Sequence, residues 1–138
     1  MKKSIIAAAF FLFAGVVFGQ TLQEGNIIAV RAYEITLQPD VTMNQFLDFW
    51  KNKWKPAQER AYPGTKVFLL KGDRGEHANQ IGVITYFESK ELRDKYWPKE
   101  GEPGPFDEAA SEIYAPLMEE GSKFVVDSKS VYTDWVIQ

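Results

Sequence analysis

The side chains that could perform chemistry are few and lie far apart in this sequence. His77 is the only histidine and the chain has no cysteine, so thiol chemistry and disulfides are excluded and most serine triads are disfavoured. Asp73 and Glu76 are near enough to His77 to join it on a metal ion, but a stable zinc site needs three or four protein ligands. A solvated loop histidine is the better interpretation. We therefore expect no metal site and no cofactor, and the catalytic residues stay unknown.

A second group of candidates is polar and stands among the apolar residues of an expected strand, 27–37. Arg31 and Tyr33 share one face of that strand, because successive side chains alternate between its faces. A buried arginine requires an anionic partner, either a ligand carboxylate or an acidic residue across the sheet, and the cost of burying a charge favours the internal ion pair. The acidic residues that could serve are Glu34, Glu88 and Asp134.

Aromatic residues supply the rest of the candidate site. Those that could line a cleft for a flat ligand are Trp50, Trp54, Tyr86, Trp97 and Trp135. Aromatic stripes at helix or strand spacing are more often core, so we expect most of these residues, Trp50 included, to pack inside the protein. We place any ligand site between sheet and helices, near Arg31, Tyr33, Trp54 and Tyr86. His77 should not be essential to it, because a polar loop is open to water.

The first 20 residues have the pattern of a secretory signal. Lys2 and Lys3 precede an uncharged apolar run, 5–18, and a small-residue exit. The alternative, a membrane anchor, needs roughly 20 apolar residues. We expect cleavage after Gly19, which leaves one secreted or periplasmic domain, 20–138, of 119 residues. Its 14 basic and 19 acidic residues give a charge of −5, which disfavours nucleic-acid and membrane partners.

Periodic segments follow one another in the order strand, helix, strand, strand, helix, strand. Thr42 and Gln45 have the spacing of a capping box at the start of the first helix, whereas Pro56 bends that helix or opens its second part. Ser89 caps a short additional helix that Pro98 stops. The expected strands are 27–37, 66–70, 81–87 and 130–137; the second main helix spans 106–121, interrupted by Pro116, after a loop at 99–105.

This order predicts an α+β fold of the ferredoxin-like βαββαβ type, in which both main helices cover one face of a four-stranded antiparallel sheet. The other face should be polar in an isolated domain, yet each expected strand is apolar on both sides. In the first strand, for example, Ile27 and Ala29 alternate with Ile28 and Val30. We expect a homodimer in which a second copy packs sheet to sheet. A flat sheet partly capped by the long loop is the alternative.

Three segments carry a resemblance to a known family: VRAYEITLQPD (30–40), PGTKVFLLKGDRG (63–75) and YFESKELRDKYWP (86–98). Together with the tryptophan-bearing helix after the first segment, they resemble the dimeric α/β-barrel superfamily, near its NIPSNAP-like or antibiotic-monooxygenase-like branches. Members of that superfamily range from cofactor-independent monooxygenases and haem-degrading enzymes to proteins with no assigned activity. The resemblance therefore implies a fold more than a reaction. Haem-degrading relatives need an axial histidine on a helix, and His77 lies on a loop.

Three functions are consistent with this sequence. The first is a secreted or periplasmic homodimer that binds a small apolar or aromatic ligand between sheet and helices. The second is a cofactor-independent monooxygenase acting on a phenolic small molecule, which requires a group that moves a proton in a dry cavity. The groups available for that step are Arg31, Tyr33, Tyr86 and His77. The third is a non-catalytic structural or interaction module, and a closed, partly polar cavity beneath the helices would discriminate among the three.

Overall fold

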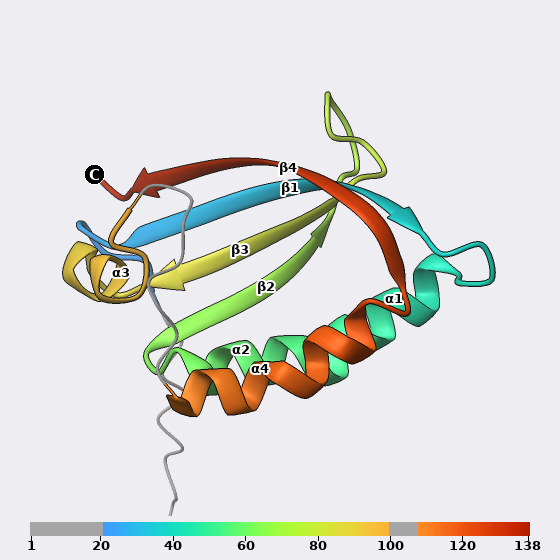
Figure 1. Ribbon diagram of the computed structural model, residues 1–138. Helices are drawn as coiled ribbons and strands as arrows, with labels where there is room; N and C mark the ends of the chain where they lie inside the picture. The colour runs from blue at the N-terminus through green and yellow to red at the C-terminus, as the bar shows by residue number, and fades with distance from the viewer. Residues whose placement is uncertain (1–20, 100–107) are drawn as a thin grey trace, which may run out of the picture.

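The computed structural model describes residues 21–99 and 108–138, and its centre is one antiparallel sheet. The strands are β1 (Ile27–Leu37), β2 (Thr65–Lys71), β3 (Ile81–Phe87) and β4 (Val125–Val136), in the spatial order β2-β3-β1-β4. The main helices lie on one side of this sheet (Figure 1). The predicted ferredoxin-like βαββαβ fold is confirmed. The predicted signal, 1–19, lies outside the described residues.

The last strand is longer than the sequence predicts. It begins at Val125 rather than near Ser130, because β4 pairs with the whole of β1, from Val136 beside Ile27 to Val125 beside Leu37. The polar residues at its start hid this pairing in the sequence. As Figure 1 shows, this long strand curves from the sheet down to the end of the helix that precedes it.

The first helical run has three parts: α1 (Met43–Phe49), a π-helical segment η1 (Trp50–Trp54) and α2 (Lys55–Ala61). The predicted capping box is present, with both Thr42 and Gln45 side chains bonded to the other residue's backbone N–H. At the end of η1 the N–H of Lys55 donates a hydrogen bond to the Trp50 carbonyl, five residues back. This wider turn precedes Pro56, which lies in the first turn of α2 and has no N–H to donate. The helical run therefore does not end near Lys55 and restart; it continues through Pro56, which takes its predicted place in the first turn of α2.

The remaining helices are α3 (Lys90–Tyr96), capped by Ser89 as predicted, and α4 (Glu108–Gly121). The predicted helix start at Phe106 lies outside the described residues, as does most of the loop predicted at 99–105. Pro116 does not interrupt α4, which corrects the prediction. It lies on the exposed side of the helix, where water can bond to the carbonyl that the missing N–H leaves unpaired. No helix in the described parts of the chain is both long and apolar enough to span a membrane.

The covered face of the sheet carries the core. Phe46 and Trp50 pack from the helical run onto Val67 and Val83 of the sheet. Trp50 is 7% exposed, which confirms the prediction that it packs as core. Burial of two large aromatic rings on β-branched side chains ties the helical run to the strands.

The opposite face of the sheet, which we call the open face, remains apolar and exposed. Its most exposed large side chains are Phe68 (50%), Leu70 (39%), Val131 (63%) and Trp135 (60%). Strand register puts them on one side of the sheet, because their cross-strand neighbours Ile84, Gly82, Ala32 and Ile28 alternate with the residues that face the helices. The two-sided apolar pattern of the sequence is thus present in the fold.

Candidate ligand-binding cavity

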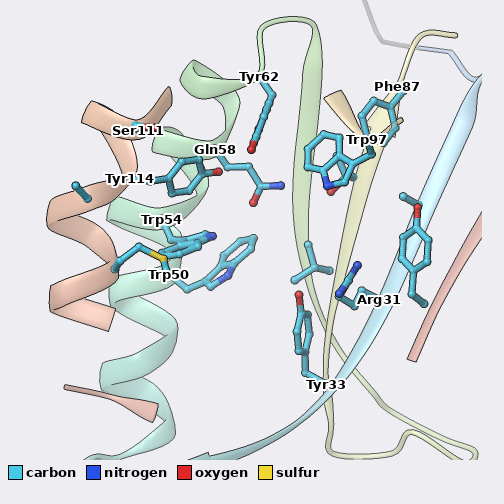
Figure 2. A pocket seen from close by; sticks show the side chains of 16 residues that line it. Arg31, Tyr33, Trp50, Trp54, Gln58, Tyr62, Phe87, Trp97, Ser111 and Tyr114 are labelled. Carbon is cyan, nitrogen blue, oxygen red and sulfur yellow. The ribbon is translucent and has the colours of Figure 1, made fainter. Parts of the chain in front are cut away.

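A cavity of about 480 Å³ lies between the covered face of the sheet and helices α2 and α4 (Figure 2). Its floor is formed where two small side chains, Ala29 of β1 and Thr85 of β3, are paired in register. On the facing helix α4, Ser111 and Ala115 are also small. Small side chains on both layers leave space that the aromatic residues around them do not fill.

The walls of the cavity are largely aromatic. Tyr62 lies with its ring centroid 4.5 Å from that of Trp97, and Trp54 lies 5.3 Å from Tyr114. Phe87 packs edge-on against Trp97 at 5.5 Å. Rings held in such clusters present flat, apolar surfaces at low entropic cost, which suits an aromatic or apolar ligand.

The structure brings together three of the four predicted ligand-binding residues. Arg31, Tyr33 and Trp54 all line the cavity. Tyr86 does not, which corrects its predicted position. Its neighbours Thr85 and Phe87 line the cavity, so alternation along β3 turns the side chain of Tyr86 to the opposite face. Ligand binding by the other three stays a prediction.

Arg31 has no ion pair with any residue that the structure describes, so the favoured internal salt bridge is wrong. Its Nη1 donates a long hydrogen bond to Ser130 Oγ at 3.4 Å, and its guanidinium carbon lies 4.8 Å from the ring centroid of Tyr132. Glu34 follows on the other face of β1 and is exposed. The positive charge therefore faces the cavity against an aromatic ring, a cation–π contact, rather than against a carboxylate.

The third predicted partner, Asp134, pairs instead with Arg93 of α3. Both side chains are mostly buried, 20% and 17% exposed, and the hydroxyl of Tyr132 also donates to Asp134. Arg93 Nε lies 2.7 Å from Asp94 Oδ1 as well. Arg93 is therefore the cation that neutralises Asp134.

Tyr33 presents a second polar group to the same space. Burial raises the pKa of its hydroxyl, and the neighbouring Arg31 charge lowers it only in part. The hydroxyl therefore stays protonated at neutral pH and can donate a hydrogen bond. Burial, together with nearby Tyr62, also raises the pKa of Tyr114 across the cavity.

Gln58 of α2 is a lining residue that the sequence reasoning missed. Figure 2 shows its amide extending from the helix toward the sheet, into the space that Arg31 and Tyr33 enter from the other side. A signal was present in the sequence. Trp50, Trp54, Gln58 and Tyr62 recur every four residues, and a single polar residue that interrupts an apolar stripe often has a role in a site.

A second cavity, of about 420 Å³, adjoins the first. Both are lined by Tyr33, Trp50, Trp54, Val83 and Met118, so the two spaces meet along these side chains. Beyond them the second cavity is mainly apolar, with walls that include Ile35, Phe46, Phe49, Ile81 and Val125. An apolar space therefore adjoins the cavity that Arg31 lines.

The lone histidine lies away from these cavities. His77 is exposed in the loop between β2 and β3, and its Nδ1 lies 2.9 Å from Oε1 of Gln80. Within the described residues, no three His, Asp or Glu side chains gather in a way that could hold a metal ion. The described lining of the main cavity likewise holds no acidic residue, lysine or histidine, so a conventional general base is missing from it.

No protein-family model and no curated protein matches this chain. Among solved structures, a NIPSNAP family protein from Agrobacterium tumefaciens is similar at 15% identity and a TM-score of 0.49, covering 78% of this chain and 90% of that chain. SnoaB, a cofactor-independent oxygenase from Streptomyces nogalater, has 11% identity and a TM-score of 0.47, covering 83% and 94%. A dimeric protein of unknown function and ferredoxin-like fold from Bacteroides fragilis has 16% identity and a TM-score of 0.41, covering 83% and 98%. These similar structures include a NIPSNAP family protein and an oxygenase, the two kinds of protein named above for their resemblance to this sequence.

Proposed function

We propose that this protein binds a small, largely apolar or aromatic molecule in the cavity between its sheet and helices. The observation that carries the proposal is the composition of that cavity. Aromatic rings form most of its wall, and polar side chains enter it from two layers, among them Arg31 and Tyr33 of β1 and Gln58 of α2. An apolar pocket with a few convergent polar groups is the usual form of a small-molecule site.

A neutral two-ring phenol, 2-naphthol, tests this proposal. We expect it to bind with micromolar affinity and to change the fluorescence of Trp50 and Trp54, which line the cavity. Ala115→Phe, at an exposed position of α4 that lines the cavity, should fill the space and weaken binding at least tenfold. The matched control is Ala109→Phe, at an exposed position of the same helix outside the described lining. Equal binding by the two variants would mean that the naphthol binds elsewhere.

We further propose that the mature protein is secreted or periplasmic and forms a homodimer through the open face. The apolar start of the sequence supports export, and the exposure of Phe68 and Trp135 supports a covering partner. Export is tested by sequencing the N-terminus of protein recovered outside the cytoplasm, which should begin at Gln20. A chain that retains Met1 in that fraction would contradict the proposed cleavage.

The second candidate function is a cofactor-independent oxidation of a phenol to a quinone. In such a reaction one oxygen atom of O₂ enters the new carbonyl group, and the other leaves as water with the two hydrogens of the phenol. Arg31 beside Tyr33 favours it, because a cation and a hydroxyl donor can stabilise a phenolate. The described lining has no conventional base, so we rank this activity second. Oxygen uptake with 1-naphthol above the protein-free rate would support it.

A further inference from the structure

Arg31 is the only charged residue in the described lining of the main cavity. The acidic side chain closest to it in the sheet, Asp134, is already neutralised by Arg93, and Glu34 lies on the other face of β1. A guanidinium that is partly removed from water and lacks a counter-ion is unfavourable unless an anion joins it. The described protein supplies no such anion, so a ligand is the group that can.

The polar side chains around Arg31 can donate hydrogen bonds to an acceptor group of a ligand. The Tyr33 hydroxyl is a hydrogen-bond donor, since burial raises its pKa further above the usual 10.0, and the amide of Gln58 can direct its N–H₂ group toward the cavity. Neither side chain has a hydrogen-bond partner among the described residues. A carboxylate accepts several hydrogen bonds at once, and a guanidinium can hold it through two parallel N–H groups.

The second cavity indicates what the rest of the ligand looks like. It begins at Tyr33, Trp50 and Trp54 and continues away from Arg31 between apolar walls such as Ile35 and Phe46. A ligand whose acidic group is at Arg31 therefore meets mainly aromatic and aliphatic side chains along its length. Its body must be apolar to gain from that burial.

We propose that the ligand is an amphipathic monoanion, whose carboxylate-like group pairs with Arg31 and whose apolar body runs past Trp50 and Trp54 into the second cavity. This inference rests on the proposed function, since it names the class of molecule that the same cavity binds. It adds that the ligand must be negatively charged and that its apolar body must be long enough to reach the second cavity. Each requirement is tested separately.

The charge requirement is tested by three probes with the same chain: decanoate, 1-decanol and decylammonium, titrated calorimetrically near pH 8. We expect decanoate to bind at least tenfold more tightly than decanol, in line with the strength of charge-assisted hydrogen bonds, and decylammonium to bind most weakly. These measurements use the unaltered protein. Equal affinities for the acid and the alcohol would overturn the inference.

Substitution then assigns the charge effect to one residue. Arg31→Met should lower decanoate affinity about tenfold or more and leave decanol affinity unchanged, because methionine keeps an apolar stem but no charge. Arg60→Met, at an exposed position outside both cavities, is the matched control. A decanoate affinity that survives Arg31→Met also overturns the inference, and a thermal melt of each variant reports whether it folds.

The length requirement is tested by hexanoate and by a blocked second cavity. Hexanoate should bind at least tenfold more weakly than decanoate, because four methylene groups no longer lie in the second cavity. Ser128 lines that cavity, so Ser128→Phe should fill it and reduce the difference in affinity between decanoate and hexanoate. Val126 is exposed and lies outside the cavity, so Val126→Phe should leave that difference unchanged. If 2-naphthol binds but decanoate does not, the cavity binds ligands and the amphipathic class is wrong. If no probe binds, the proposed function itself fails.

Discussion

The two faces of this sheet have similar apolar sequences and different surroundings. On the covered face, Trp50 packs at 7% exposure and a cavity with Arg31 at its edge remains between the layers. On the open face, Trp135 is 60% exposed, and Phe68 and Val131 are also exposed. An apolar strand pattern therefore marks a surface that must be covered, but it does not say whether a helix or a second chain covers it.

The polar residues of the two faces differ in their exposure. Arg31 and Tyr33 lie on the covered face, where burial strengthens hydrogen bonds and charge pairing. The open face combines exposed apolar side chains such as Phe68 and Trp135 with exposed charged ones such as Lys129, as an apolar interface with a polar rim does. A ligand site and an association site can thus share one thin sheet without sharing side chains.

The largest effect that separates the faces should come from their tryptophans. Trp50→Ala should lower the free energy of unfolding by about 3–5 kcal/mol, because the ring is lost from the core. Trp135→Ala is the matched variant on the open face. It should alter stability only through association, so its effect should depend on protein concentration. Denaturant melting at two concentrations checks both, and a Trp50→Ala loss near zero would remove that residue from the core.

Association through the open face should show the next largest effect. Val131→Glu, at 63% exposure, puts a charge into the proposed interface on both subunits, and we expect loss of the dimer, at roughly 2–4 kcal/mol for a desolvated interface position. Ala109→Glu on α4 is the control, because it adds the same charge away from the sheet. Sedimentation equilibrium measures the change. An unaltered protein that stays monomeric at micromolar concentration would falsify the proposed dimer.

Local signals in the sequence predicted most of this fold. The Thr42 capping box, the Ser89 cap and the apolar periodicities act within a few residues, and such short-range effects can be read along the chain. The continuity of α4 through Pro116 was missed, because it depends on which side of the helix meets water. The early start of β4 was missed because pairing with β1, rather than strand propensity, sets its length.

The site was predictable only where it followed from one strand. Alternation along β1 was enough to associate Arg31 with Tyr33. The position of Tyr86 depended on which face of β3 meets the helices, and the isolation of Arg31 depended on Arg93 reaching Asp134 from a helix more than 40 residues away in sequence. The spacing of residues along the sequence predicts neither the face of Tyr86 nor the pairing of Arg93 with Asp134. Gln58 did have a signal, since it occupies the Trp50–Trp54 stripe.

A smaller effect, on ligand affinity, should separate the buried site from the exposed loop between β2 and β3. Tyr33→Phe should weaken 2-naphthol binding by about 0.5–1.5 kcal/mol, the net value of one hydrogen bond, because the hydroxyl faces the cavity and the ring is retained. His77→Ala should leave binding nearly unchanged, since that side chain lies in the loop between β2 and β3 and contacts Gln80. Fluorescence titration of the two variants decides this. If His77→Ala abolished binding and Tyr33→Phe left it unchanged, the ligand site would lie in the loop rather than in the cavity.

The smallest effect concerns a contact that fastens the covering helix to the sheet. Glu59 of α2 accepts a hydrogen bond at 2.8 Å from the N–H of Val67, in edge strand β2, and pairs with Lys55 at 3.2 Å. Desolvation by burial opposes ionisation of Glu59, but the Val67 and Lys55 contacts outweigh it and lower the pKa of the carboxyl below its usual 4.5. The charged form therefore stabilises the fold.

Glu59→Gln keeps an acceptor for Val67 and removes only the charge, so we expect a loss of about 0.3–0.5 kcal/mol near neutral pH. Because the folded pKa is the lower one, this difference should persist down to the unfolded value near 4.5 and disappear as the pH falls through the folded value. Urea melts of both proteins across that range measure it, and Glu112→Gln, at an exposed position of α4, controls for the loss of one negative charge. A difference that grows as the pH falls would show that the carboxylate does not hold α2 against β2.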